Sequence, residues 1–387
     1  ADGGTRKMSR GARKIILWSV ILVASAALFA YCFVSRFRLP AFFPFDWGGG
    51  SSSSGFTVLK EEEVAAPEEL HITWSSGQVR LLSGGDRLRV VQKGPSSFRQ
   101  EQCFALEESD SGRVLTIRDC RRPGFYFLGF GIERCDLEIT LPEKQYRALT
   151  ADLSSADITT AALTAESLTL QSSSGDIEAA GNYGTAAVRS TSGDVRLEGL
   201  ACSGKLQVGS TSGDVAAEGL SCGDLEASTA SGDLKLAGRA GFAAVSSSSG
   251  NVKLDGLRSA SEFRIKTVSG DIRGSGVEGT LLTVATTSGN IRLDGRYMGL
   301  QLNTTSGNAD LTTSAALDSL RSDSVSGTVT VVMPDNGGFD LSFHKLSGSF
   351  HSDFSTTQDG EWYRYGDGGR SFSVNTVSGD FHLRQNG

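Results

Sequence analysis

The chain has 387 residues, 48 of them glycine, and a formal net charge of −7. A chain of this length is expected to hold two or three domains. Its acidic balance lacks the basic face or stripe typical of proteins that bind DNA or RNA, so no nucleic acid is expected as a partner.

The first element expected along the chain is a transmembrane helix over residues 15–34. This run carries no charge and is long enough to cross the apolar core of a bilayer. More positive charge precedes it than follows it, which predicts a cytoplasmic tail over residues 1–14 and export of the rest. The alternative is a signal peptide cleaved after Ala24-Ser25-Ala26, and the length of the run favours an uncleaved anchor. The expected location is therefore the cell membrane, single-pass, with an extracytoplasmic C-terminal part.

Residues 35–69 are expected to be an interfacial and Gly/Ser-rich linker, because aromatic side chains suit a membrane interface and Gly/Ser segments are flexible. Residues 70–150 alternate apolar and polar side chains without a fixed period, which predicts an N-terminal β cap. Cys103 and Cys120 are equally distant from a turn at Ser111-Gly112. They are therefore expected to face each other across a hairpin, as a candidate disulfide.

Between residues 151 and 334, Ser-Gly-Asp or a close variant recurs every 18 to 20 residues. Apolar side chains flank each copy at every second position, which is the period of a β-strand. A fixed period near 20 residues indicates stacked repeats, whose strands pair with their equivalents in the next repeat. The sequence therefore predicts an all-β fold. It is a parallel β-solenoid (β-helix) of about ten 18–20-residue rungs with irregular β caps, preceded by one transmembrane helix.

The corner of each repeat holds the residues assigned to a structural turn. The glycine is expected to have a positive φ, and the Asp or Asn after it to bond its own backbone. The Ser and Thr before it are expected to form a hydroxyl ladder in which every member is satisfied. The turn residues are Gly175, Asp176, Gly193, Asp194, Gly213, Asp214, Gly232, Asp233, Gly250, Asn251, Gly270, Asp271, Gly289, Asn290, Gly307 and Asn308.

The repeats also raise the questions of a bound metal ion and of a covalent cross-link. Stacked carboxylates could recruit Ca²⁺, but Asn and Thr replace Asp in several copies. A turn role permits that exchange and a calcium site does not favour it, so no metal or cofactor is expected. Cys202 and Cys222 occupy the same slot in consecutive repeats and are a second candidate disulfide, which leaves Cys135 as the odd thiol.

Residues 335–387 are expected to form aromatic-rich C-terminal rungs and a cap. Phenylalanine, tyrosine and tryptophan crowd this segment, and bulky side chains that fill wider last rungs explain them. The alternative is an aromatic platform for a ligand in the loop over residues 356–370.

Three features of the sequence resemble one known family. They are the core TVSGDI at residues 267–272, the closing VNTVSGDFHL at 374–383, and a proline directly after a strand at Pro142 and Pro334. Over roughly residues 70–385 the chain resembles the bacterial putative-adhesin family of β-strand-repeat proteins, domains of unknown function often found behind an N-terminal anchor. The resemblance implies the architecture and a surface location, and it brings no active site with it.

The expected function is that of a membrane-anchored extracytoplasmic β-solenoid with a structural, adhesive or binding role at the bacterial cell envelope. Its partners would be the membrane through its own anchor, an unidentified envelope polymer or membrane protein, or a second copy. No enzyme is expected, because the four histidines are scattered. Two alternatives stay open. A polysaccharide-active β-helix enzyme would need paired carboxylates in a cleft. An envelope-stress regulator would need a membrane partner, since a 14-residue tail cannot fold alone.

Overall fold

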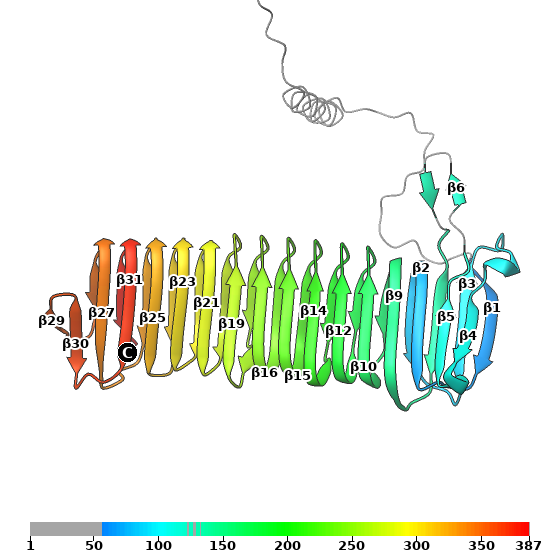
Figure 1. Cartoon of the computed structure of the whole chain (residues 1–387), viewed down its shortest axis with the longest axis horizontal. Coiled ribbons are helices and arrows are strands. Elements are labelled where there is room, and N and C mark those ends of the chain that lie inside the picture. Colours follow the sequence, from blue (N-terminus) through cyan, green and yellow to red (C-terminus); the bar gives the residue numbers. More distant parts are fainter. Residues whose placement is uncertain (1–55, 122–123, 127–128, 132, 387) are drawn as a thin grey trace, which may run out of the picture. The chain divides into compact units, whose positions relative to one another are not determined.

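The repeats stack because each corner separates two strands that then pair with the equivalent strands of the next repeat. The computed structural model describes residues 56–386 except 122–123, 127–128 and 132. A single 30-stranded sheet holds every strand except β6 and β7, which form a separate pair. Its strands stand side by side in one row, and each repeat adds one rung to that row (Figure 1).

The N-terminal end combines parallel and antiparallel strands. β2 pairs in parallel with β9 in one unbroken register, in which Leu70 lies opposite Leu149 and Val79 lies opposite Ile158. β1, β3 and β4 run antiparallel to their neighbours. The elements here are β1 (Thr57–Val64), β2 (Glu69–Ser83), β3 (Leu88–Gly94), the 3-10 turn η1 (Gln100–Gln102), β4 (Ala105–Ser109), the 3-10 turn η2 (Asp110–Gly112), β5 (Val114–Arg118), β6 (Gly124–Tyr126), β7 (Gly129–Gly131), β8 (Asp136–Leu141) and β9 (Gln145–Thr160).

The central strands follow the corner motif. Strands before a corner pair with one another, as Val188 does with Val208, and strands after a corner do the same, as Ile177 does with Val195. These strands are β10 (Leu163–Ser172), β11 (Ile177–Ala179), β12 (Gly181–Ser190), β13 (Val195–Glu198), β14 (Ala201–Ser210), β15 (Val215–Thr229), β16 (Leu234–Ser247), β17 (Val252–Asp255), β18 (Arg258–Ser259), β19 (Glu262–Thr267), β20 (Ile272–Glu278), β21 (Leu281–Ser288), β22 (Ile291–Arg296), β23 (Gly299–Ser306), β24 (Ala309–Thr313), β25 (Ser319–Ser326) and β26 (Val329–Met333).

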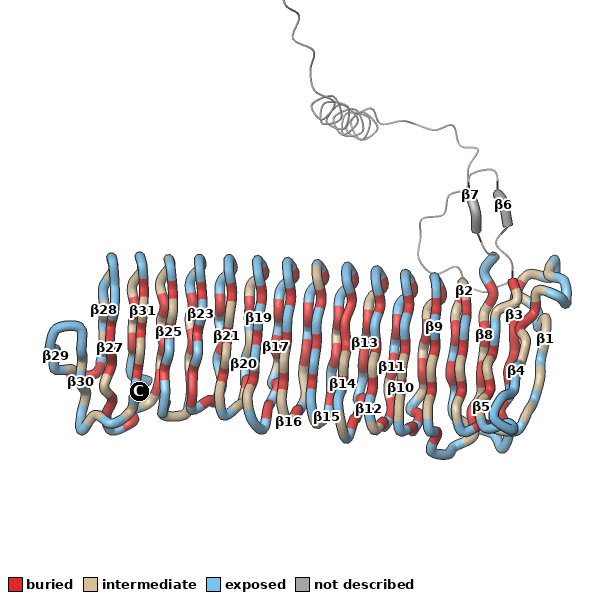
Figure 2. The backbone as a smooth tube through the Cα atoms, viewed as in Figure 1, coloured by how far each residue is buried: buried red, intermediate tan, exposed pale blue. Residues whose placement is uncertain are grey.

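One apolar core runs through all the rungs. Alternate side chains of each strand point inward, and Figure 2 shows buried and exposed residues alternating along the strands. Ile177 and Val195 are fully buried and lie in register, so each layer covers the next. Burying one such side chain stabilises the fold by roughly 1.5–3 kcal/mol. The core cluster extends from Leu70 to Leu383 without a break.

The C-terminal strands do not follow chain order. β31 lies between β25 and β27, and β32 lies between β26 and β28, so the end of the chain inserts between two earlier rungs (Figure 1). β30 and β29 continue the row beyond β27 as antiparallel strands. The strands are β27 (Gly338–Ser347), β28 (Phe350–Ser352), β29 (Thr357–Asp359), β30 (Trp362–Gly366), β31 (Ser371–Ser378) and β32 (Phe381–Gln385).

The fold class expected from the sequence was wrong as stated. The all-β part holds, because the helical elements among the described residues are only the two short 3-10 turns. The parallel row is not ten rungs between irregular caps, since β2, β5 and β8 before it and β31 and β32 after it pair in parallel and in register. Chain order and spatial order also differ at both ends.

The expected transmembrane helix is corrected as well. Within the part of the chain that the structure describes, no helix has the length and apolar character needed to cross a membrane. The run at residues 15–34 and the tail before it lie outside the described residues. The single-pass anchor, and the cell-membrane location derived from it, therefore have no support in the structure.

Candidate functional site

The Asp and Asn residues at the corners form a continuous ladder of hydrogen bonds between rungs. Oδ1 of Asp194 accepts the backbone N–H of Asp214 at 2.8 Å, and Oδ1 of Asp233 accepts that of Asn251 at 2.7 Å. The same bond links every step from Asp157 to Thr328. The expectation that these side chains bond their own backbone was therefore wrong. Asp and Asn share the acceptor oxygen that the ladder needs, which explains why they exchange freely.

The buried hydroxyls three residues before each corner glycine hold the corner from inside. The N–H of Gly175 donates to Oγ of Ser172 at 2.9 Å, and Oγ of Ser190 donates to the carbonyl oxygen of Gly175 at 3.3 Å. These hydroxyls bond backbone groups rather than one another. The expectation that all are satisfied fails among the later rungs, because four of these hydroxyl oxygens have no partner among the described residues: Ser247, Thr286, Thr304 and Thr376.

The corner glycines are required by crowding rather than by a positive φ. Among the assigned turn glycines only Gly307, with φ +114°, has a positive φ, whereas Gly270 and the others do not. A Cβ on Gly270 would overlap the carbonyl oxygen of Gly250 in the neighbouring rung. The left-handed conformation is found instead at the second glycine of many repeats, such as Gly219 with φ +67°. The expected φ of the corner glycines is corrected accordingly.

The candidate disulfide residues lie where their spacing predicts. Cys202 of β14 and Cys222 of β15 are register partners, and β4 and β5 pair so that their flanking residues Cys103 and Cys120 are close in the hairpin. All five described cysteines are free thiols. Burial raises the pKa of Cys202 to about 12, with a further contribution from Cys222, and burial raises the pKa of Cys222 to about 11. Disulfide formation at either pair stays a prediction.

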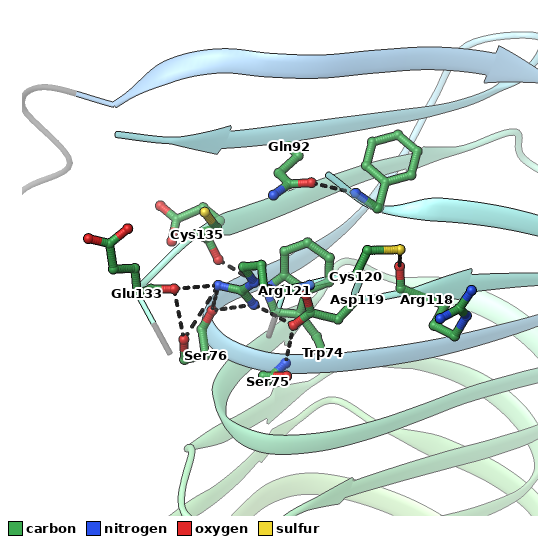
Figure 3. A network of polar contacts seen from close by, with 12 residues as sticks. Trp74, Ser75, Ser76, Gln92, Arg118, Asp119, Cys120, Arg121, Glu133 and Cys135 are labelled. Atoms are coloured by element: carbon green, nitrogen blue, oxygen red, sulfur yellow. Dashed lines mark hydrogen bonds and ion pairs between the residues drawn. The ribbon is translucent and has the colours of Figure 1, made fainter. Parts of the chain in front are cut away.

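The N-terminal end holds a buried ion pair that was not predicted from the sequence (Figure 3). Nη2 of Arg121 lies 2.6 Å from Oδ2 of Asp119, with both side chains almost fully buried. The guanidinium also donates to the carbonyl oxygens of Ser76 and Glu133 and lies 4.5 Å from the centre of the Trp74 ring. Burial alone would raise the pKa of Asp119, but the hydrogen bonds and charge of Arg121 hold it below its usual range.

This ion pair has a structural role. It fastens β2 to the residues on both sides of positions 122–132, because Arg121 precedes them and Glu133 follows them. The sequence carries no signal for it, since charged residues two apart are far more often exposed than buried.

Most aromatic residues of the C-terminal segment fill the core of the last rungs. Phe339 stacks on Phe372 with ring centroids 4.8 Å apart, and Tyr365 packs against Phe339 from β30. Trp362 differs, because 57% of its surface is exposed on the opposite face of β30. Trp362 and Arg364 line a cavity of about 530 Å³ beside β29.

The remaining titratable groups do not gather into a metal site. Among the described ranges, no group of three or more His, Cys, Asp or Glu side chains could hold a metal ion. His351 and His382 stack with centroids 4.8 Å apart on neighbouring strands β28 and β32, without a third ligand-type side chain beside them.

The comparisons with known proteins give one family and several solved structures. The family model described as Toastrack DUF4097 matches the chain twice, over residues 67–241 and 240–384. No curated protein matches. A putative adhesin from Parabacteroides distasonis is 15% identical, covers 65% of this chain and 98% of its own, and has a TM-score of 0.42. A putative adhesin from Parabacteroides merdae is 13% identical, with coverages of 66% and 95% and a TM-score of 0.39. A putative lipid binding protein from P. distasonis is 15% identical, with coverages of 66% and 97% and a TM-score of 0.38.

Proposed function

We propose, from the premise that this chain belongs to the Toastrack DUF4097 family, that it is a non-enzymatic protein with a binding or adhesive role. The two matched ranges confirm the family resemblance drawn from the repeat motifs. The observation that carries the proposal is the register of the rungs, which places an outward-facing side chain at the same position of every rung along the row. Neighbouring strands lie about 4.8 Å apart, so such a row offers an extended partner many closely spaced contacts.

The way in which the corner carboxylates are used supports binding rather than catalysis. A general acid needs a carboxyl whose pKa is raised, next to a second carboxylate that stays ionised. The corner carboxylates instead accept backbone N–H groups of the next rung. On the outer faces, hydrogen bonds lower carboxyl pKa values. Lys205 and Gln207 donate to Glu226 and lower its pKa, and Arg264 does the same for Glu262.

The charges on the outer faces are balanced locally. Lys205 lies 2.7 Å from Glu226 one rung away, and Arg196 lies 3.6 Å from Glu178. These pairs are half-exposed, so each contributes at most about 1 kcal/mol to stability. Positive and negative side chains alternate on this face. Such a face favours a partner that makes many weak polar contacts over a partner with a strong net charge.

The test is a binding series against polymers of increasing length. The immobilised full chain is exposed to soluble polysaccharides and extended polypeptides, each as a short and a long form. We expect at least one long polymer to be retained with an affinity well above that of its short form, because successive rungs engage it together. Retention of none of them would contradict the binding role. Cleavage of a retained polymer, seen as new chain ends, would instead establish an enzyme.

A further inference from the structure

The C-terminal end of the row carries a small antiparallel face that the repeats do not have. β30 lies between β27 and β29, with Trp362 opposite both Ser342 and Asp359, and Arg364 opposite both Asp340 and Thr357. Because side chains alternate along a strand, Trp362 and Arg364 share the outer face of β30. Tyr363 points the other way and packs on Phe350, with ring centroids 4.6 Å apart.

This face is hollowed. The cavity of about 530 Å³ is lined by Asp340, Thr357, Gln358, Asp359, Trp362 and Arg364, among others. Trp362 is the one exposed large aromatic side chain among the described residues, at 57% exposure. An indole ring presents a large, rigid apolar surface, and leaving it in water forgoes the stabilisation that its burial would bring.

The polar groups around the ring divide into fixed and open ones. Asp340 is fully engaged, because its Oδ1 accepts Nε of Arg364 at 2.6 Å and its Oδ2 accepts the N–H of Gly369 at 2.9 Å. This contact orients the guanidinium and leaves its two terminal nitrogens without a partner in the described part of the chain. The carboxylate of Asp359, directly across from Trp362, has no partner there either.

We propose that this cavity binds a neutral saccharide, with one sugar ring stacked on Trp362; the inference rests on the binding role proposed above. A sugar ring has an apolar C–H face that fits an aromatic surface, and its hydroxyls both donate and accept. The open carboxylate of Asp359 accepts from hydroxyls and the open nitrogens of Arg364 donate to them. A saccharide therefore satisfies the ring and both charged groups together.

Other ligand classes match the cavity less well. A purely apolar ligand, such as a lipid chain, would cover Asp359 and Arg364 without offering them hydrogen bonds, which is costly. An anionic ligand would meet the carboxylates of Asp340 and Asp359 beside a single guanidinium. An extended peptide could pair with the edge of β29, but that strand is only three residues long and offers few backbone bonds.

The same groups indicate binding without cleavage. Hydrolysis of a glycosidic bond requires one carboxyl to be protonated at working pH. The hydrogen bond from Arg364, together with that from the N–H of Gly369, lowers the pKa of Asp340, so this carboxyl stays ionised. Asp340 is therefore unsuited to act as a general acid.

The experiment measures binding of hexasaccharides of glucose, mannose, xylose and N-acetylglucosamine to the full chain by calorimetry and tryptophan fluorescence. We expect at least one to bind, with Trp362→Ala weakening it tenfold or more and Asp359→Ala weakening it severalfold. Trp362→Phe keeps an aromatic face and should lose less than Trp362→Ala. The control is Leu346→Ala on β27, because Leu346 is an 85% exposed apolar side chain outside the cavity lining. It should bind as the unchanged chain does.

Three outcomes would overturn the inference. They are no binding of any hexasaccharide, equal binding by Trp362→Ala and the unchanged chain, or an equal loss in Leu346→Ala. Thermal unfolding of each variant shows whether it is folded, and Trp362→Phe keeps the test valid if Trp362→Ala is not. If the chain retains a polypeptide but no hexasaccharide, the saccharide site is refuted while the general binding role stands.

Discussion

Asp233 accepts the backbone N–H of Asn251 across the gap between two rungs, at 2.7 Å, and Asn251 in turn accepts the N–H of Asp271 at 3.1 Å. Each corner side chain is thus bonded to the next rung, and the contact runs in one direction along the row. The role of these residues is therefore tied to an acceptor oxygen and not to charge.

Asp233→Ala removes one step of this ladder and should lower the free energy of unfolding by about 0.5–1.5 kcal/mol, the usual net value of one hydrogen bond. Asp233→Asn keeps the acceptor oxygen and should be nearly neutral. At low salt it should be slightly stabilising, because it removes repulsion from Asp214. Chemical denaturation of both variants makes the comparison. Equal losses in the two would show that the charge matters and would contradict the ladder.

Gly270→Val places a branched side chain where the carbonyl oxygen of Gly250 already lies. Because the obstacle is a backbone atom at the corner of the neighbouring rung, between β16 and β17, we expect a loss of about 1–3 kcal/mol or more in the free energy of unfolding. The control is Lys266→Val in the same rung, at an exposed outward position of β19 where a β-branched residue suits the strand. A loss at Lys266 as large as that at Gly270 would refute the crowding argument.

Arg121→Leu leaves the Asp119 carboxylate buried without its partner. We expect a loss of about 3–5 kcal/mol, since breaking a buried pair from one side uncovers the full desolvation cost. Arg118→Leu is the matched control, because its ion pair with Glu107 is exposed to solvent and should contribute little to stability. Similar losses in both variants would show that the buried network of Figure 3 is not special.

The same pair predicts how stability depends on acid. The pKa of Asp119 is below its ordinary value of 3.8 in the folded chain. A depressed carboxyl pKa contributes stability that is fully present above the ordinary value and is lost as the pH falls through the folded value. Unfolding measured from pH 6 to pH 2 should therefore show a steeper acid loss in the unchanged chain than in Asp119→Asn. Parallel curves would argue against the pair.

Removal of divalent ions should leave the fold unchanged. The ladder uses Oδ1 of each corner carboxylate for a backbone N–H, so the corner is complete without a cation. The melting temperature in excess chelator should equal that in millimolar Ca²⁺. A drop of more than a few degrees in chelator would mean that a bound ion stabilises the folded state.

Mild oxidation should join Cys202 to Cys222 and Cys103 to Cys120, because each pair lies in neighbouring positions. The thiol pKa values of about 12 and 11 at Cys202 and Cys222 make the thiolates scarce at neutral pH. The rate of this cross-link should therefore rise about tenfold for each pH unit from 7 to 9. Peptide mapping without reductant identifies the pairs, and a bond from Cys202 to Cys135 would contradict the register.

The repeat itself could be predicted because a period of 18 to 20 residues with alternating apolar positions leaves few ways to bury the core. The in-register pairing of Cys202 with Cys222 followed from the same count. The insertion of β31 between β25 and β27 could not be predicted. The local sequence of a strand does not show whether it stacks on the preceding strand or pairs between two earlier ones. The sequence did not reveal why the corner residue must be glycine, because the atom that a Cβ would overlap belongs to another rung. For Gly270 that atom is the carbonyl oxygen of Gly250, 20 residues earlier.

The candidate site, too, could be predicted from the sequence only in part. A count of aromatic residues indicated that the C-terminal segment was either core or platform, and it did not separate Trp362 from Phe339. The separation comes from the alternation of β30 against β27, which only the register shows. Asp119 and Arg121 were missed because burial of a charged pair depends on what covers it, here Trp74 and the carbonyl oxygens of Ser76 and Glu133.

The strands that return past their neighbours change how the row can come apart. In a simple stack of repeats the outermost unit is held on one side only, so such proteins fray from their ends. Here β2 and β31 each have partners on both sides, although they lie near the two ends of the described chain. If β27 and β28 separate from the row, β31 and β32 become exposed but stay paired with β25 and β26. A truncation that removes residues 371–385 would therefore take away β31 and β32 from inside the row. It would leave β27 and β28 without the strands on which they stack.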